Sequence, residues 1–226
     1  MRHRSIAIDG PSGAGKSTLA KALAEALGFL YVDTGAIYRT VGLQAFRAGV
    51  DPSDPQAVIP LLKALDIAMK YGSDGLQHMY LNGEDVTAEI RRHEISAFAS
   101  AVSAIPEVRA FLMEQQRSLA REHDVVMDGC DIGTVVLPGA DVKIFLTAAP
   151  EVRARRRWLE LQQRGQPADY ETVLRDVKAR DAQDTSRAAA PLRQAEDAVL
   201  ADTTDKDLEQ SLALLKLIAK EHLAHG

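Results

Sequence analysis

The fold of this chain is decided near its start, by the stretch Ile6-Ala7-Ile8-Asp9-Gly10-Pro11-Ser12-Gly13-Ala14-Gly15-Lys16-Ser17-Thr18. From Gly10 onward the spacing fits G-x-x-x-x-G-K-[ST], the phosphate-binding loop, or P-loop. The residues before the loop are typical of a short buried strand, and Leu19 to Leu27 is typical of a helix. A glycine-rich hairpin is the alternative interpretation. Because the loop lies between a strand pattern and a helix pattern, we favour a site for a nucleoside triphosphate.

Each part of the P-loop has a chemical role. Glycines let backbone N–H groups curl around a polyphosphate, and the start of the following helix directs its dipole at the same anion. Lys16 supplies a charge for the β- and γ-phosphates, and the Ser17 hydroxyl is a candidate Mg²⁺ ligand. The predicted triphosphate-binding residues of the loop are Gly10, Ser12, Gly13, Ala14, Gly15, Lys16, Ser17 and Thr18.

Composition limits the class of protein. The chain has 226 residues, 46% hydrophobic and 26% charged, which is enough for one α/β domain with insertions or for two small domains. Its net charge of −5 argues against a nucleic-acid partner. Cys130 is the only cysteine, and no apolar run is long enough to span a membrane. We therefore expect a cytoplasmic protein that does not bind membranes.

Strand and helix patterns alternate along most of the chain, which predicts a parallel, doubly wound α/β sheet. Residues 50–90 differ, with short strand patterns separated by the turns Gly72-Ser73-Asp74-Gly75 and Asn82-Gly83. We interpret them as a small inserted subdomain of antiparallel strands. Residues 150–187 are helical and rich in arginine, which is typical either of a solvated face or of a lid over a triphosphate. The prediction is a single unit, residues 1–226, with this insertion and this lid.

Two further segments are candidates for chemistry. Asp128 closes an apolar strand, so its carboxylate is expected at the ligand-binding edge of the sheet, near the P-loop. It suits a Mg²⁺–water shell or a substrate hydrogen bond, although an acid that caps the next turn is the alternative. The segment Asp33-Thr34-Gly35-Ala36-Ile37-Tyr38-Arg39 combines a hydroxyl, an aromatic ring and an arginine, which fits a second substrate with Arg39 on its phosphate. An ordinary helix start with a surface arginine is the alternative.

The chain resembles bacterial cytidylate kinases nearly end to end. The resemblance is carried by the segments described above, together with Asp128-Gly129-Cys130-Asp131-Ile132-Gly133-Thr134-Val135-Val136 and Lys178-Ala179-Arg180-Asp181. It implies ATP-dependent phosphoryl transfer to CMP or dCMP with Mg²⁺, by a monomeric enzyme of the P-loop kinase type. The CMP-binding residues that it implies are Thr34, Tyr38, Arg39, Ser100, Arg109, Asp128, Cys130, Asp131, Arg180, Asp184 and Arg187. It further implies catalytic roles for Lys16, Asp128, Arg180 and Arg187, and contacts of Arg153 and Arg157 with ATP.

One position departs from the family. Where its motif reads Asp-Gly-Arg-Asp, this chain has Cys130, and a neutral thiol cannot supply a charged, bidentate fork to the acceptor phosphate. We therefore expect a weakened kinase. A thiolate of lowered pKa, acting as a redox switch, is a further hypothesis. A P-loop kinase with another acceptor and a non-catalytic nucleotide-binding module also stay open, whereas a GTPase is disfavoured because the chain lacks an Asn-Lys-x-Asp segment.

Overall fold

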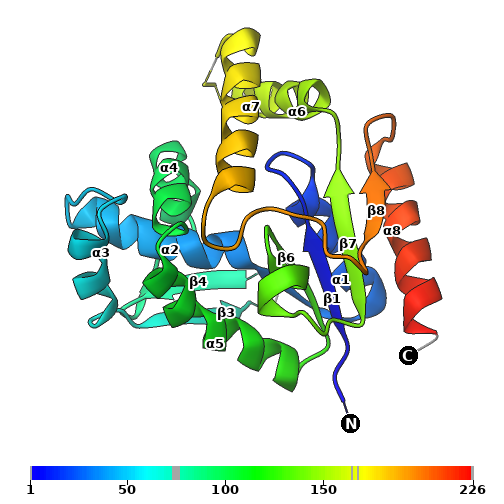
Figure 1. Ribbon diagram of the computed structural model, residues 1–226, viewed down its shortest axis with the longest axis horizontal. Coiled ribbons are helices and arrows are strands. Elements are labelled where there is room, and N and C mark those ends of the chain that lie inside the picture. Colours follow the sequence, from blue (N-terminus) through cyan, green and yellow to red (C-terminus); the bar gives the residue numbers. More distant parts are fainter. Residues whose placement is uncertain (1, 73–76, 164, 167, 225–226) are drawn as a thin grey trace. The chain divides into compact units, whose positions relative to one another are not determined.

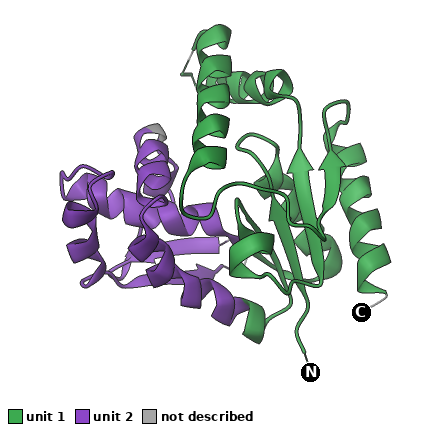
Figure 2. Ribbon diagram, viewed as in Figure 1, with its two compact units in different colours: residues 1–31, 120–226 green, residues 32–119 purple. Residues whose placement is uncertain are grey.

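A five-stranded parallel sheet carries the P-loop in the computed structural model, which describes residues 2–72, 77–163, 165–166 and 168–224 (Figure 1). The described chain divides into two compact units, residues 1–31 with 120–226 and residues 32–119 (Figure 2). Of the predicted turn at residues 72–75, only residue 72 is among the described residues. Positions 164 and 167 of the predicted lid are outside them.

The first unit contains the parallel sheet. Its elements are β1 (Ser5–Asp9), α1 (Lys16–Leu27), β2 (Leu30–Asp33, which crosses the boundary), β6 (Val125–Gly129), the π-helical turn η2 (Ile132–Val136), β7 (Val142–Thr147), α6 (Pro150–Gln163), α7 (Tyr170–Ser186), β8 (Val199–Asp202) and α8 (Leu208–Leu223). The strand order is β2-β6-β1-β7-β8. Strand β1 pairs in parallel with β6 on one side and β7 on the other, so the P-loop leaves the sheet from its central strand.

Burial explains the pattern of these strands. All five residues of β1 are buried, as expected for a parallel strand covered on both faces. Helices α1 and α8 contribute Leu19, Leu23, Leu215 and Ile218 to the same core. Gly28 ends α1 in the left-handed conformation, with its N–H donated to carbonyls of the last turn. The predicted parallel α/β fold is thereby confirmed.

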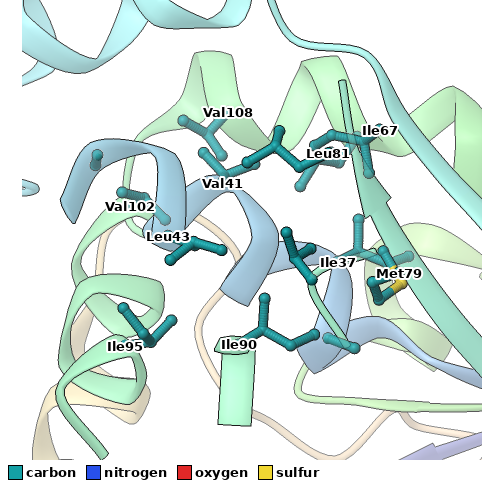
Figure 3. Close-up of a cluster of buried hydrophobic side chains, with 14 of the residues drawn as sticks. Ile37, Val41, Leu43, Ile67, Met79, Leu81, Ile90, Ile95, Val102 and Val108 are labelled. Atoms are coloured by element: carbon teal, nitrogen blue, oxygen red, sulfur yellow. The ribbon is translucent and has the colours of Figure 1, made fainter. Parts of the chain in front are cut away.

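The second unit has its own sheet and core. Its elements are α2 (Thr34–Arg47), α3 (Pro55–Leu62), β3 (Ile67–Tyr71), β4 (Gln77–Leu81), β5 (Glu84–Asp85), the 3₁₀ turn η1 (Glu89–Arg91), α4 (His93–Val102) and most of α5 (Pro106–Glu122). The strands form an antiparallel sheet in the order β3-β4-β5. Side chains from α2, both longer strands and α4 meet in a core that includes Ile37, Leu43, Met79 and Ile95 (Figure 3).

Several boundaries follow from local chemistry. Helix α2 begins at Thr34, because the Asp33 carboxylate caps it by accepting the N–H of Ala36 at 2.9 Å. Pro106 separates α4 from α5 and stands at the start of α5, where a proline costs no helical hydrogen bond. The compact unit of residues 32–119 extends beyond residues 50–90 because α2, α4 and α5 share the core of β3 and β4.

No single helix among the described residues is long and apolar enough to cross a membrane. Helices α4 and α5 pass that test only as a pair bent by 95°. Their apolar residues Ile95, Val102, Val108 and Leu112 are buried in the core of the second unit.

Candidate functional site

The P-loop adopts a conformation that only glycines allow. A Cβ atom at Gly10 would lie 1.9 Å from the backbone oxygen of Leu146 on β7, so the loop starts against the neighbouring strand. Gly13 and Gly15 have φ values of 78° and 89°, in the left-handed region. No described side chain caps the start of α1, and its first turn has no acidic residue. Free helix N–H groups at that position favour an anion.

Lys16 is held within the loop that it serves. Its ammonium nitrogen donates to the carbonyl oxygens of Gly10 at 2.7 Å and of Pro11 at 2.9 Å. These contacts hold the positive charge at the start of the loop. The arrangement suits the β- and γ-phosphates of a nucleoside triphosphate.

Asp128 lies next to the P-loop, at the carboxyl edge of the sheet. It stands opposite Ile8 in the register of β6 with β1 and is 4% exposed. Ser17 donates its hydroxyl to one carboxylate oxygen at 3.0 Å, and Tyr31 donates to the other at 2.9 Å. A hydroxyl and a carboxylate are hard oxygen donors, so this pair fits Mg²⁺. The described residues contain no group of three or more His, Cys, Asp or Glu that could hold a metal ion.

Asp9 ties the start of the P-loop to the segment after β6. Its carboxylate accepts the backbone N–H groups of Ile132 and Gly133, each at 2.7 Å. Burial raises the pKa of Asp9 to about 6, against the opposing effect of these hydrogen bonds. The carboxylate thereby positions the backbone that follows Cys130 and Asp131.

The pKa of Asp9 predicts a pH dependence of stability. The folded protein holds this proton up to a pH of about 6, whereas the unfolded chain loses it near 3.8, so the contribution of Asp9 to stability falls as pH rises through this interval. The free energy of unfolding should fall with pH more steeply than in Asp9→Asn, by up to about 1.4 kcal/mol per pH unit. Urea unfolding of both proteins from pH 4 to 8 measures this difference between the two slopes. The other titrating groups contribute equally to both proteins, so their contributions cancel. Parallel curves would contradict the prediction.

Cys130 lies among charges but carries none. The side chain is half-buried, and burial raises the pKa of its thiol. Asp184 and Asp131 add to this rise, whereas Lys16 and Arg187 oppose it. The thiol is therefore neutral near pH 7, and the hypothesis of a thiolate of lowered pKa is wrong.

The two arginines predicted to contact ATP have different environments. Arg153 is 3% exposed and donates to the oxygens of Ala148, Ser12 and Asp181. Arg157 lies nearer to solvent and contacts Glu160 at 3.3 Å. Arg157 therefore keeps more freedom to reach a ligand than Arg153, whose guanidinium is engaged by protein atoms.

Helix α7 brings three predicted CMP-binding residues together. Arg180 and Arg187 both approach the buried carboxylate of Asp184, at 3.8 and 3.7 Å. Arg187 also donates from Nε to the carbonyl of Ala190 at 2.7 Å, and its side chain is only 9% exposed. Its Nη2 group and the Nε of Arg180 are buried without a hydrogen-bond partner among the described residues. Buried donors of this kind suit an anionic ligand.

The remaining predicted residues lie in the second unit. The guanidinium of Arg109 stacks over the Tyr38 ring, 5.4 Å from its centroid, and donates to the carbonyl of Ser103 at 3.0 Å. Thr34 and Arg39 lie in α2, and a Cβ at Gly35 would be 3.3 Å from the Arg39 guanidinium. Ser100 lies in the last turns of α4, where its carbonyl accepts the Ser103 hydroxyl at 2.8 Å.

Sequence reasoning missed three residues that shape the P-loop site. Asp9 has the same signal as Asp128, an acid at the end of an apolar strand, and this signal could have identified it. Tyr31 and Asp181 carry no such signal. Their partners Asp128 and Arg153 are distant in sequence, so only the fold brings them together.

Comparison with known proteins identifies the family. The sequence model of the cytidylate kinase family matches residues 6–220. A cytidylate kinase of Caldicellulosiruptor bescii is 50% identical over 212 residues, which are 94% of this chain and 93% of that protein. A cytidylate kinase of Geobacter sp. strain M21 is 48% identical, over 98% of this chain and 94% of its own length. One of Shouchella clausii is 45% identical, over 96% of each protein. The chain therefore belongs to the cytidylate kinase family.

Proposed function

We propose that this protein transfers the γ-phosphoryl group of ATP to CMP or dCMP, giving ADP and CDP or dCDP. The observation that carries the proposal is the P-loop of a cytidylate kinase family member with Ser17 and Asp128 hydrogen-bonded beside it. The alternatives of another acceptor and of a non-catalytic module have no comparable support.

Phosphoryl transfer needs positioning and charge stabilisation rather than a covalent enzyme intermediate. The backbone N–H groups of the loop and Lys16 hold the triphosphate, so that an acceptor oxygen can attack in line. Ser17 and Asp128 would hold Mg²⁺, which would supply positive charge to the β- and γ-phosphates. Arg180 and Arg187 would stabilise the phosphoryl group in transit, which their unpartnered buried nitrogens support.

We assign binding of the acceptor nucleotide to the remaining polar residues of the predicted site. Thr34, Tyr38 and Arg39 would bind the monophosphate, and Ser100, Arg109 and Asp131 would read the cytosine edge, whose amino group suits a carboxylate. Asp184 would accept a hydrogen bond from a hydroxyl group of the ribose. The packing of Arg109 on Tyr38 supports this role, because it fixes a planar donor with little remaining freedom.

Residues 50–90 are proposed to be the monophosphate-binding insertion and residues 150–187 the lid. A monomeric cytoplasmic enzyme, with no nucleic-acid or membrane partner, completes the proposal. The net charge of −5 supports the absence of a nucleic-acid partner, and the single cysteine supports the cytoplasmic location. The monomeric state rests on the resemblance to the family.

The test is ADP release with ATP and Mg²⁺, measured with CMP, dCMP, UMP and AMP as acceptors. Faster turnover with CMP or dCMP is the expected result. Faster turnover with UMP or AMP would move the assignment to another acceptor. Binding of ATP without any turnover would identify a nucleotide-binding module.

Cys130→Arg should increase kcat/KM for CMP. The substitution restores a charged donor beside Asp131 and Asp184, and one hydrogen bond to a charged group contributes about 1.5–3 kcal/mol, or roughly tenfold to a hundredfold. Steady-state kinetics with CMP varied at saturating ATP measures the gain. Cys130→Met is the control for size and should show no gain. Equal kcat/KM in the arginine variant and the native protein would show that the thiol is no handicap.

A further inference from the structure

Backbone carbonyl groups of the P-loop are held by cationic side chains. Lys16 contacts the oxygens of Gly10 and Pro11, Arg153 contacts that of Ser12 at 3.0 Å, and Arg156 contacts that of Ala14 at 3.4 Å. A loop that directs successive N–H groups at an anion must turn carbonyl groups away from it. The contacts with Arg153 and Arg156 therefore hold the loop from the side opposite to its ligand.

The guanidinium of Arg153 is committed to protein atoms. Its Nε donates to the carbonyl of Ala148 at 2.8 Å, and its Nη1 donates to Asp181 at 2.9 Å as well as to Ser12. Its Nη2 donates to the second carboxylate oxygen of Asp181, which completes a bidentate ion pair. With four of its five N–H groups engaged and 3% exposure, Arg153 has little capacity left for a phosphate.

The ion pair joins the P-loop to α7. Asp181 lies next to Arg180 and three residues before Asp184, within one turn of the helix that carries proposed CMP-binding residues. Close approach reinforces the link, because a Cβ at Gly13 would lie 3.4 Å from the Cβ of Arg153. Ser12, Arg153 and Asp181 thus form one continuous path of hydrogen bonds from the loop through α6 to α7.

We propose that Arg153 is a positioning residue rather than a phosphate ligand: anchored by Asp181, it holds the Ser12 carbonyl and so preorganises the P-loop for ATP. This inference rests on the proposed binding of ATP at the P-loop. A preorganised loop does not have to be ordered when the ligand arrives, and loss of the anchor should therefore weaken binding.

Asp181→Ala separates the two roles of Arg153. A positioning Arg153 loses its anchor, and the Kd of Mg²⁺·ATP should rise about tenfold. A phosphate-binding Arg153 would instead be freed from a competing carboxylate, and ATP would bind as tightly as before or more tightly. Arg153→Met should weaken binding in both cases, by about tenfold or more. Arg153→Lys should be intermediate, because one ammonium cannot replace the fork.

The measurement is calorimetric titration of each variant with Mg²⁺·ATP in the absence of CMP. Arg155→Met is the matched control, since it removes the same charge from an exposed position of α6 and should leave the Kd within about twofold. The midpoints of thermal unfolding show whether a variant stays folded. If Asp181→Ala does not, Asp181→Asn replaces it, because asparagine retains the volume of the side chain. An unchanged or tighter Kd in the Asp181 variant overturns the inference.

Failure of the proposed function is a separate result. If CMP is not phosphorylated but the Kd for ATP follows the expected order, the positioning role stands and the acceptor assignment falls. If CMP is phosphorylated and the Asp181 variant keeps its Kd and its KM for ATP, the acceptor assignment stands and the positioning role falls.

Discussion

Asp128→Asn is expected to lower kcat for CMP phosphorylation about a thousandfold while the protein stays folded. The substitution keeps the shape of the side chain and an oxygen that can accept the Ser17 hydroxyl, now 3.0 Å from the carboxylate. It removes the negative charge that suits the Mg²⁺ shell. The KM for ATP should change much less, because the loop and Lys16 bind the phosphates directly. Steady-state kinetics at saturating Mg²⁺ measures both constants.

Tyr31→Phe is the matched control for Asp128→Asn. It deletes the other hydrogen bond to the carboxylate, 2.9 Å long, and leaves the charge in place. A loss of only about threefold to tenfold is expected from one neutral donor. Equal losses in the two variants would mean that Asp128 acts through its hydrogen bonds and the packing of Tyr31, not through its charge.

Gly10→Ala is expected to cost several kcal/mol of stability, about 3 or more, and to abolish ATP binding in the protein that remains folded. The added Cβ would stand 1.9 Å from the Leu146 oxygen. That oxygen belongs to the backbone of a buried strand, so it cannot move aside as a side chain could. Either β1 and β7 separate at this point or the loop takes a different path. Urea unfolding and ATP titration of the same preparation measure the two losses.

Gly28→Ala controls for the backbone contribution. Gly28 also has a positive φ, 70°, but a Cβ there would meet nothing within 4 Å. Its substitution should cost about 1 kcal/mol from conformation alone and leave ATP binding unchanged. A similar cost at both positions would show that the overlap with Leu146 is relieved without harm.

The P-loop and the strands were predictable because their signals are local. Gly10, Lys16 and Ser17 stand at fixed spacing, and the apolar runs of β1, β6 and β7 mark buried parallel strands. Asp128 could be placed near the loop because the carboxyl ends of parallel strands share one edge. The structure confirms that placement with the Ser17 contact.

The electrostatic details were not predictable, because they depend on burial and on distant partners. The run Arg153-Ala154-Arg155-Arg156-Arg157 gives no sign that the first arginine is nearly inaccessible and the third residue exposed. The pKa of Cys130 is raised, not lowered as hypothesised, because the effect of desolvation outweighs that of the neighbouring cations. Residue spacing predicts neither the burial of Arg153 nor the raised pKa of Cys130.

Strand order also has a consequence for biosynthesis. The first strand made, β1, lies between β6 and β7, so Ile6 must wait for Val126 and Val142 before both of its edges are paired. The unit of residues 32–119, in contrast, is continuous in sequence and has a core of its own. During translation that unit can collapse while β1 and the P-loop still have open edges. The nucleotide site is then among the last parts of the nascent chain to acquire its structure.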